Sequence, residues 1–441
     1  MVNRMYIYDP KLSGSRSRCG ERLITSGTQS DPYYPDRAVS EFFERAGVNS
    51  EHARAHEGLG QTPAALSSKF LWPKKFIWGA RTFSTNIQSS FQRAIDAVSK
   101  DAAFRHLPDV RTIPIAIMAL DDNGGRPLAG QREMEMFFSG SLLKVAAMYA
   151  AFQLRVAVNN LAATLDAKVI NTKVKLWQKI SDTFDKQIDG SVPRISSAYG
   201  VTPAMRVPKY PTVFEAEIVG GTWRLRFVAG ADNFAGHLGK MIAGSYNESA
   251  RFCIRALGYS WINGLMQAAG FLRFGFPGSE GIWLAADYAE ENKWPVVVIP
   301  SVNDGKVKQA TTCFDMARLF ALLRDKKLVK NTFGNDQMLR LLELAVDHPH
   351  AKSLLKTVSH SFTVEQSKIG VGELKKAPQG GAGSCRIADH GCVLSEGSIL
   401  LHPPSGRRFV TVWQNVLWDA PLIGVRRVAA VIQKTMDDYK P

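Results

Sequence analysis

The segment SGSLLKVAAMYAAFQLRVAV, residues 139–158, decides how the rest of this chain is interpreted. From Ser141 to about Val158 it is apolar nearly all round for its first three turns, which is typical of a helix buried inside a domain. Ser139, Gly140 and Ser141 stand at its start, where N-cap residues belong. The sequence therefore predicts a central, buried helix that begins at Ser141.

This helix start also places a hydroxyl and an amine three residues apart. Residues i and i+3 share a helix face, so the amine of Lys144 is within reach of the hydroxyl of Ser141. A free serine hydroxyl is a poor nucleophile and needs an adjacent base. A lysine can be that base when burial or a second cation lowers its pKa. We therefore take Ser141 as a candidate nucleophile and Lys144 as its candidate base.

The S-x-x-K pattern is weak by itself, because the chain contains a second copy, Ser353-Leu354-Leu355-Lys356. Only Ser141 opens a long apolar helix, so we expect the copy at 353–356 to be accidental. The alternative for residues 141–144 is an ordinary helix start with an exposed lysine.

Two further short motifs follow Ser141 in the chain. Ser245-Tyr246-Asn247 offers a hydroxyl and a carboxamide on one loop, but S-x-N also occurs at 84–86 and 301–303, and a helix N-cap is the plainer interpretation. Lys368-Ile369-Gly370, at the end of an expected strand, is the only K-x-G in the chain. Its lysine supplies positive charge, and its glycine would let a substrate lie along the strand edge without a clashing Cβ.

The flanking patterns predict the order of elements. A helix is expected over about 86–104, and the apolar run at 112–120 precedes a strong hairpin turn, Asp121 to Gly125. The middle of the chain is expected to be mostly helical, with an inserted hairpin near 214–227 that turns at Gly220-Gly221 and helices over 307–325 and 335–346. Strands at 359–372 and 398–416 and a helix over 420–439 close the chain.

This order predicts an α/β (α+β) fold, with an antiparallel sheet built from both chain ends and flanked by helices, and an inserted all-helical domain. We expect residues 66–140 and 331–441 to form the α/β domain and residues 141–330 the mainly helical one. Residues 1–65, rich in Ser, Gly, Arg, Pro and Asp, are expected to be a partly disordered extension.

Composition limits the partners. The 441 residues carry a formal net charge of +15, which suits a polyanionic partner such as an anionic cell-wall polymer. The basic residues are scattered and form no zinc-finger or RNA-binding pattern, which disfavours nucleic acid. Neither a signal peptide nor a stretch of about 18–20 apolar residues is visible, so we expect a cytoplasmic protein without a membrane span. No cofactor or metal motif is present. Among five cysteines, Cys385 and Cys392 are spaced to close a small loop.

Taken together, S-x-x-K, S-x-N and K-x-G in this order resemble the signature motifs of serine β-lactamases and penicillin-binding proteins, most closely the class A β-lactamases. The resemblance covers about residues 86–437. It implies that Ser141 is acylated by a small-molecule or peptide substrate, with Lys144 as base or proton relay. It also implies residue roles that composition does not show: proton transfer and substrate holding by Ser245, Tyr246 and Asn247, binding of the substrate's acidic end by Lys368 beside Gly370, and an oxyanion hole made of the backbone N–H groups of Ser141 and Val371.

The chain departs from that family in four respects. Ile369 stands where a hydroxyl residue is usual, which removes a donor for the substrate carboxylate. No clear counterpart of the glutamate that activates the deacylating water follows the second motif, and Glu280 is the nearest candidate. The spacing from Ser141 to Ser245 is long, which the inserted hairpin would explain. Family members usually act in the periplasm or outside the cell, whereas no export signal is visible here.

Three hypotheses stay open. The first is a serine hydrolase of the β-lactamase-like family, acting on an amide or ester that need not be a β-lactam. The second is a DD-peptidase or transpeptidase like the penicillin-binding proteins. The third is a catalytically silent member that binds a ligand or partner. An intact Ser141 and Lys144 pair argues against the third hypothesis, and Ile369 argues for it.

Overall fold

The structure of the chain is a computed structural model, and it describes residues 71–73, 75–76, 85–120, 126–274, 279–288, 297–374, 392–418 and 421–440. The predicted extension at 1–65 and the turn at 121–125 lie outside the described residues. The same holds for Cys385 and for the side chain of Cys392, and so for any bond between them. Cys253 and Cys313 are buried and free.

A five-stranded antiparallel sheet joins the two ends of the chain, in the order β10-β11-β12-β1-β2. Its strands are β1 (Ile115–Leu120), β2 (Leu128–Gln131), β10 (Thr363–Glu373), β11 (Cys392–His402) and β12 (Arg407–Leu417). The first strand pairs directly with the last, so that Ile115 lies opposite Trp413. The predicted fold class, an antiparallel sheet built from both chain ends, is confirmed.

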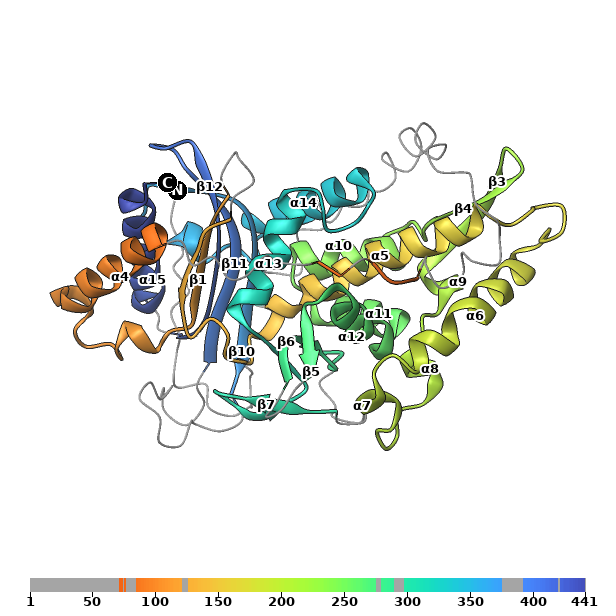
Figure 1. The fold of residues 1–441 in the computed structure, drawn as a ribbon, viewed down its shortest axis with the longest axis horizontal. Coiled ribbons are helices and arrows are strands. Elements are labelled where there is room, and N and C mark those ends of the chain that lie inside the picture. Colours follow the sequence, from red (N-terminus) through yellow and green to blue (C-terminus); the bar gives the residue numbers. More distant parts are fainter. Residues whose placement is uncertain are drawn as a thin grey trace.

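The sheet separates two hydrophobic cores because side chains alternate along a strand. In β1, Ile115 and Ile117 pack into the core on one side, while Ala116 and Met118 pack into the core on the other. Helices α4 (Thr85–Lys100) and α15 (Ile423–Asp438) cover the first side, at the left of Figure 1. Helix α13 (Cys313–Arg324) and the helical part of the chain cover the second.

The helical part contains most of the remaining elements. Its helices are α5 (Lys144–Ala162), α6 (Lys173–Asp189), α7 (Pro193–Ser196), α8 (Pro203–Arg206), α9 (Tyr210–Val213), α10 (Phe234–Ala243), α11 (Asn247–Leu257), α12 (Tyr259–Ala269) and α14 (Thr332–Val346). Short 3-10 turns lie at η2 (Ala102–Phe104), η3 (Val110–Thr112), η4 (Gly140–Leu143) and η5 (Leu355–Thr357).

Short strands interrupt this part of the chain. The hairpin predicted near 214–227 is formed by β3 (Phe214–Val219) and β4 (Thr222–Phe227), and its turn residues Gly220 and Gly221 both have positive φ. Five more strands were not predicted: β5 (Leu272–Phe274), β6 (Ser279–Leu284), β7 (Ile299–Ser301), β8 (Gly305–Val307) and β9 (Gln309–Thr311). The helix predicted over 307–325 was therefore too long, because its first residues pair as strands and α13 begins only at Cys313.

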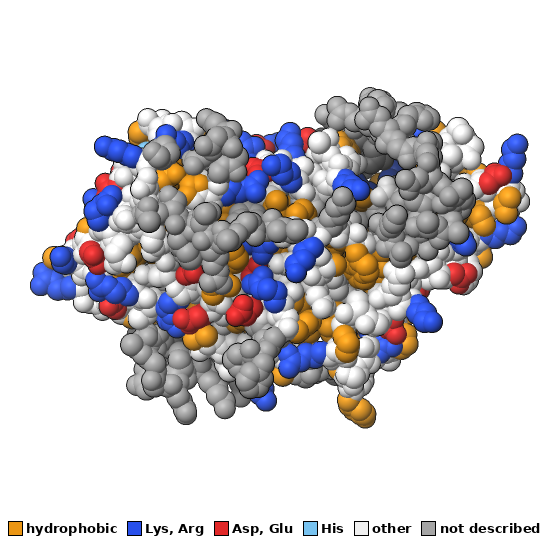
Figure 2. Space-filling view, viewed as in Figure 1, with side chains coloured by type: hydrophobic (Ala, Val, Ile, Leu, Met, Phe, Trp, Pro, Cys, Tyr) orange, Lys and Arg blue, Asp and Glu red, His pale blue; other side chains and the backbone are white. Residues whose placement is uncertain are grey.

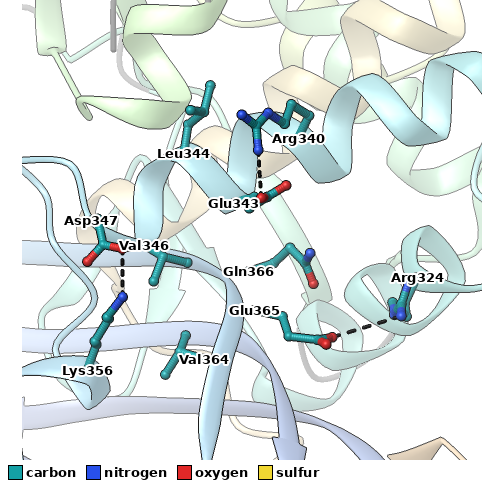
Figure 3. A pocket seen from close by; sticks show the side chains of 10 residues that line it. All are labelled: Arg324, Arg340, Glu343, Leu344, Val346, Asp347, Lys356, Val364, Glu365 and Gln366. Atoms are coloured by element: carbon teal, nitrogen blue, oxygen red, sulfur yellow. Dashed lines mark hydrogen bonds and ion pairs between the residues drawn. The ribbon is translucent and has the colours of Figure 1, made fainter. Parts of the chain in front are cut away.

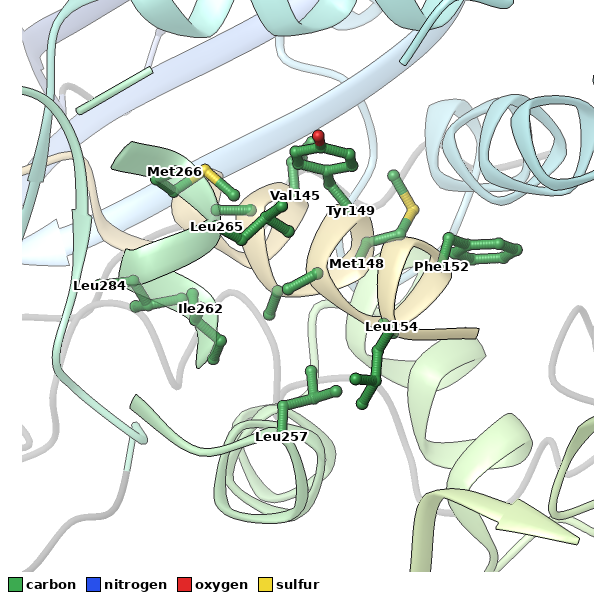
Figure 4. Close-up of a cluster of buried hydrophobic side chains, with 14 of the residues drawn as sticks. Val145, Met148, Tyr149, Phe152, Leu154, Leu257, Ile262, Leu265, Met266 and Leu284 are labelled. Carbon is green, nitrogen blue, oxygen red and sulfur yellow. The ribbon is translucent and has the colours of Figure 1, made fainter. Parts of the chain in front are cut away.

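Helix α5 is the centre of the larger core. Figure 4 shows its side chains, among them Val145, Met148 and Phe152, packed against residues of α11, α12 and β6. The helix with its preceding turn, Gly140–Ala162, is long and apolar enough to cross a membrane, with a mean hydropathy of 1.3, contrary to the sequence-based expectation. However, 94% of its most apolar 18-residue segment is buried inside the protein. The predicted buried central helix is therefore confirmed.

The basic side chains are dispersed over the surface. On the face drawn in Figure 2, lysine and arginine side chains lie scattered among acidic and neutral ones rather than in one patch. Many of the described arginines are ion-paired, for example Arg408 with Glu365 at 2.8 Å. The net charge of +15 is thus a property of the whole chain, and this face shows no single polyanion-binding surface.

Candidate active site

The candidate nucleophile lies in the 3-10 turn η4 and not, as the sequence predicted, at the first residue of a helix. Ser141 is the second residue of η4, and α5 begins only at Lys144. Ser139 flanks the turn without a side-chain capping bond, so the predicted N-cap at 139–141 is not formed. The 3-10 turn η4, and not the first turn of α5, therefore carries the Ser141 hydroxyl. Ser141 is 6% exposed.

Lys144 joins the first motif to the second. Its side chain is 0% exposed, and its Nζ donates to the backbone carbonyl of Ser245 at 2.5 Å and to Oδ1 of Asn247 at 2.8 Å. These partners come from the loop before α11, more than a hundred residues further along the chain. The structure therefore brings Ser141, Lys144, Ser245 and Asn247 together, as the sequence predicted for a shared site.

The loop that carries the second motif has an unusual backbone. Ser245 has φ of +60°, which non-glycine residues rarely adopt and which is often found at functional sites. This conformation turns the carbonyl of Ser245 to Lys144, while Tyr246 is the N-terminal flanking residue of α11. The Oγ of Ser245 is buried and has no hydrogen-bond partner among the described residues.

The third motif packs against the first. On β10, a Cβ added to Gly370 would collide with the carbonyl oxygen of Ser139 and lie 2.8 Å from the backbone nitrogen of Leu142. Ser395 of β11 also holds the turn of Ser141 against the sheet, because its Oγ donates to the Ser139 carbonyl at 2.7 Å. Gly370 was predicted to leave room for a substrate along the strand edge. That interpretation was wrong, because the backbone of the nucleophile's turn occupies the space.

Ile369 faces away from the site. Its side chain is buried in the core under α4 and α15, on the opposite side of the sheet from Lys144. Lys368, its neighbour in the strand, is 1% exposed and lies close enough to Lys144 to depress that residue's pKa. Ile369 therefore contributes to the core, and the effect of the missing hydroxyl on binding of a substrate carboxylate stays a prediction.

Burial controls the charge of both lysines. It lowers the pKa of Lys144 well below the ordinary value, and the positive charge of Lys368 lowers this pKa further. Burial alone lowers the pKa of Lys368 to about 7. A neutral amine at Lys144 is a proton acceptor, so this environment is the one that a base for the Ser141 hydroxyl requires.

The two proposed oxyanion-hole residues are neighbours. Gly140 has φ of +56°, and a Cβ at this position would lie 3.0 Å from the backbone nitrogen of Val371 and would collide with the Val371 carbonyl. The backbone of Val371 therefore passes directly beside the residue that precedes Ser141. Two backbone N–H groups on adjacent segments are the arrangement that an oxyanion hole requires.

Glu280 is not among the groups that contact the lysine. It lies on β6 with a 55% exposed side chain, and its ion pair is with Arg273 on β5 at 3.7 Å. The group that packs on Lys144 is Tyr288, whose ring centroid lies 4.6 Å from Nζ and whose hydroxyl donates to the Gly140 carbonyl at 3.2 Å. Glu280 as a deacylation base thus stays a prediction without a supporting contact.

Sequence reasoning missed several residues that shape the site. Tyr288 gave no motif, although its φ of +60° marks it as special in the structure. Asn303 belongs to one of the competing S-x-N copies. It clamps the backbone of Phe138 from both sides, accepting from its N–H at 2.9 Å and donating to its carbonyl at 3.1 Å. His348 lies edge-on to the ring of Tyr246, with a centroid separation of 6.1 Å. Neither Tyr288 nor His348 has a spacing signal in the sequence, and the S-x-N copy at 301–303 gave no indication of the contact between Asn303 and Phe138.

A pocket of about 560 Å³ lies between α14 and β10, and it does not contain the site. Its walls carry basic and acidic side chains that pair with one another, as Figure 3 shows for Arg340 with Glu343 at 2.6 Å and Lys356 with Asp347 at 2.6 Å. Neither Ser141 nor Lys144 lines it. Among the described residues, no group of three or more His, Cys, Asp or Glu is placed to hold a metal ion.

No family model and no curated protein sequence matches the chain. Solved structures that resemble it include a class A β-lactamase from Bacteroides cellulosilyticus, at 12% identity and a TM-score of 0.41, covering 80% of this chain and 99% of that one. A β-lactamase from Chitinophaga pinensis matches at 14% identity and 0.42, covering 80% of this chain and 99% of that one. A protein named PBP-A matches at 15% identity and 0.39, covering 83% and 99%.

Identities of 12–15% and TM-scores below 0.5 say nothing about activity or substrate. The chemistry of the site therefore has to be argued from the contacts of this chain.

Proposed function

We propose that the protein is a serine hydrolase of the β-lactamase-like kind, in which Ser141 is acylated by an amide or ester substrate and Lys144 takes its proton. One observation carries the proposal: the buried amine of Lys144 contacts Ser245 and Asn247 at 2.5 and 2.8 Å. Two motifs that are weak in the sequence thereby meet at one lysine. A helix start with an exposed lysine, the plain alternative, is at odds with 0% exposure of Lys144.

The proposed reaction uses only groups of this chain. The neutral amine of Lys144 accepts the hydroxyl proton while the Ser141 oxygen attacks the substrate carbonyl. The backbone N–H groups of Ser141 and Val371 stabilise the negative charge that develops on the carbonyl oxygen. A proton returns to the leaving group by way of Lys144 and the hydroxyl of Ser245. This hydroxyl has no hydrogen-bond partner among the described residues. The product of this half-reaction is an ester on Ser141.

A DD-peptidase-like or transpeptidase-like activity is the second candidate, favoured by Tyr288. Besides Asn247, the side chain described in contact with Lys144 is Tyr288. Its aromatic ring cannot activate a water. Among the described residues, no carboxylate is hydrogen-bonded to Lys144. An acyl-enzyme without a carboxylate that activates water would be hydrolysed slowly, as that of a penicillin-binding protein is. The two activities share the first step and differ in the lifetime of the ester.

The test is intact mass spectrometry after incubation with a fluorescent penicillin and, separately, with a fluorophosphonate. We expect an adduct on the wild-type protein and none on Ser141→Ala. Ser353→Ala is the matched control, since it changes the serine of the other Ser-Leu-Leu-Lys segment, and it should be labelled like the wild type. If folded wild-type protein forms no adduct with either reagent, the proposal is wrong and a silent binding protein is the better hypothesis.

The lifetime of the penicillin adduct separates the two activities. Fast loss of the adduct together with turnover of nitrocefin would support a hydrolase acting on β-lactams. A long-lived adduct together with cleavage of a D-Ala-D-Ala peptide would support the DD-peptidase-like function.

A further inference from the structure

Several buried polar atoms around the candidate site have no hydrogen-bond partner among the described residues. Three of them are the Oγ of Ser245, the Nζ of Lys368 and the Nε2 of His348. Their residues are 1%, 1% and 2% exposed, so bulk water does not satisfy them either. A buried polar group without a partner costs about 1–3 kcal/mol, and more when it is charged. Groups that are left in this state next to a reactive serine indicate a site that a ligand completes.

His348 was not predicted from the sequence, and it belongs to this cluster by geometry. It lies in the loop after α14, and its Cε1 is 3.0 Å from the position of a Cβ added to Gly244. The ring therefore packs on the loop that continues into Ser245 and Tyr246. The nitrogen bonded to that carbon, Nε2, is the unpartnered one.

The hydrogen bond on the other ring nitrogen fixes the tautomer. The backbone N–H of His350 donates to Nδ1 of His348 at 3.1 Å, so Nδ1 carries no proton. A neutral imidazole then has its proton on Nε2, which makes that atom a donor. Burial, His350 and Lys368 together lower the pKa of His348 to about 3, so the ring is neutral at physiological pH. His348 thus presents a permanent N–H donor.

We propose that His348 is a substrate-binding residue, whose Nε2–H acts with the Nζ of Lys368 to hold a carboxylate of the acyl donor. This inference rests on the proposed function, and it adds His348 as a second residue that binds the acidic end of the substrate beside Lys368. Lys368 supplies positive charge, and His348 supplies a directed hydrogen bond. A carboxylate has enough acceptor positions for both groups at once.

The chemistry of the cluster selects an anion over other ligands. All three unpartnered atoms can donate a hydrogen bond, and two of them, on Lys368 and His348, are nitrogens that carry a proton at neutral or lower pH. Among the described residues, no carboxylate is hydrogen-bonded to either nitrogen. The groups that face His348 are the rings of Tyr246 and His350 and the amine of Lys368. None of these is an anion at neutral pH, so a cationic substrate group would be repelled.

The experiment compares two substrates on the wild-type protein and two variants. Benzylpenicillin carries a carboxylate, and its methyl ester does not, so the ratio of their second-order acylation rate constants measures recognition of the carboxylate. His348→Leu removes the donor, and His348→Gln retains an N–H donor at about the position of Nε2. Labelling by a fluorophosphonate, which carries no carboxylate, and thermal unfolding report whether each variant is folded and reactive.

We expect His348→Leu to slow acylation by benzylpenicillin about 10-fold or more, the range for a hydrogen bond to a charged group, and to leave the methyl ester within about 2-fold. His348→Gln should recover most of the loss. An equal loss for both substrates would show a structural role and overturn the inference. An unchanged ratio in His348→Leu would also overturn it.

A binding measurement separates this inference from the proposed function. Calorimetry of benzylpenicillin with Ser141→Ala, and with Ser141→Ala carrying His348→Leu, tests the carboxylate site where no acylation can occur. If the wild-type protein is not labelled but the double variant binds benzylpenicillin with a roughly 10-fold weaker Kd, the acyl chemistry is wrong and the role of His348 is supported. Labelling by the fluorophosphonate, with no effect of His348 on either substrate or on Kd, would retain the proposed function and overturn the role of His348.

Discussion

The two Ser-Leu-Leu-Lys segments of the chain, at 141–144 and 353–356, have the same side chains in very different surroundings. Lys144 is 0% exposed and donates to Ser245 and Asn247. The side chain of Lys356 is 41% exposed and pairs at 2.6 Å with Asp347, which is itself 60% exposed. A surface ion pair of this kind contributes little, whereas burial changes the acidity of the amine itself.

The serines differ as much as the lysines. Ser353 donates at 2.6 Å to Glu396, a fully buried carboxylate that also accepts from Ser367 and Ser398. Its hydroxyl is therefore committed to holding a loop on the sheet. Ser141 lies in the turn beside Gly370, and it is 6% exposed. Among the described residues, no carboxylate is hydrogen-bonded to it. What makes one copy a candidate catalyst is the partner of each side chain, which the tetrapeptide does not specify.

The largest difference between the copies should appear when each lysine is replaced by methionine. We expect Lys144→Met to slow fluorophosphonate labelling of Ser141 by about 10²- to 10⁴-fold, because it removes a general base. Lys356→Met should label within about 2-fold of the wild type. Stopped labelling reactions followed by mass spectrometry give both rates. Equal rates for Lys144→Met and wild type would show that another group activates the serine.

Buried positive charge should be visible in the stability of the protein. Lys368 has a pKa of about 7 in the folded protein against 10.5 for a free side chain. The unfolded state therefore binds more protons between these two values, and stability should rise as pH rises from about 7 to about 10.5. Lys368→Met should remove this rise and stabilise the protein at pH 7 by roughly 2–5 kcal/mol.

Urea unfolding at several pH values measures this effect. The exposed Lys356→Met variant is the matched control and should keep the wild-type pH dependence. A pH dependence that is the same in Lys368→Met and wild type would mean that Lys368 is solvated in the folded protein.

Ser353 should contribute to the stability of the protein and not to the labelling reaction. We expect Ser353→Ala to lower the free energy of unfolding by about 1–3 kcal/mol, because it removes a donor from the buried carboxylate of Glu396. Denaturant titration measures the loss, and labelling of the folded fraction at Ser141 should stay at the wild-type rate. A Ser353→Ala protein as stable as the wild type would contradict the structural role given to this copy.

The smallest predicted effect concerns the two lysines of the site together. Lys368 lowers the pKa of Lys144, so Lys368→Met should raise it again. Acylation needs the neutral amine, and its rate rises with pH through the pKa of Lys144. We therefore expect the midpoint of the pH–rate profile with a fluorophosphonate to move to higher pH in Lys368→Met. A midpoint that stays in place would show that the two amines do not interact.

Much of the fold followed from local patterns in the sequence. The apolar helix after Ser141, the hairpin at Gly220-Gly221 and the pairing of early with late strands all rest on periodicity or on turn chemistry that acts over a few residues. The strands between 299 and 311 were missed because each is only three residues long, too short for an alternation to show. The helix prediction then extended backwards over them.

The site was predictable only as a set of candidates. The long apolar helix that follows Ser141 selected it over Ser353. The order of the motifs did not separate Ser245 from the copy at 301–303, which also lies between Ser141 and Lys368. The direction in which a strand side chain points depends on register, so the sequence could not tell that Ile369 enters the core. His348 and Tyr288 reach the site through loops whose path only tertiary packing determines. These residues carry no spacing that a sequence motif could use.

The contact between Gly370 and the carbonyl of Ser139 also has a consequence for how the protein is made. The two residues are more than two hundred positions apart, and β1 has no partner on one side until β12 exists. A nascent chain that has emerged only as far as α14 therefore holds Ser141 without the strand that positions it. Pairing over such sequence distances is slow, because loop-closure entropy is lost before the contacts form. The turn that carries Ser141 is thus positioned only after β10 and β12 have been synthesised.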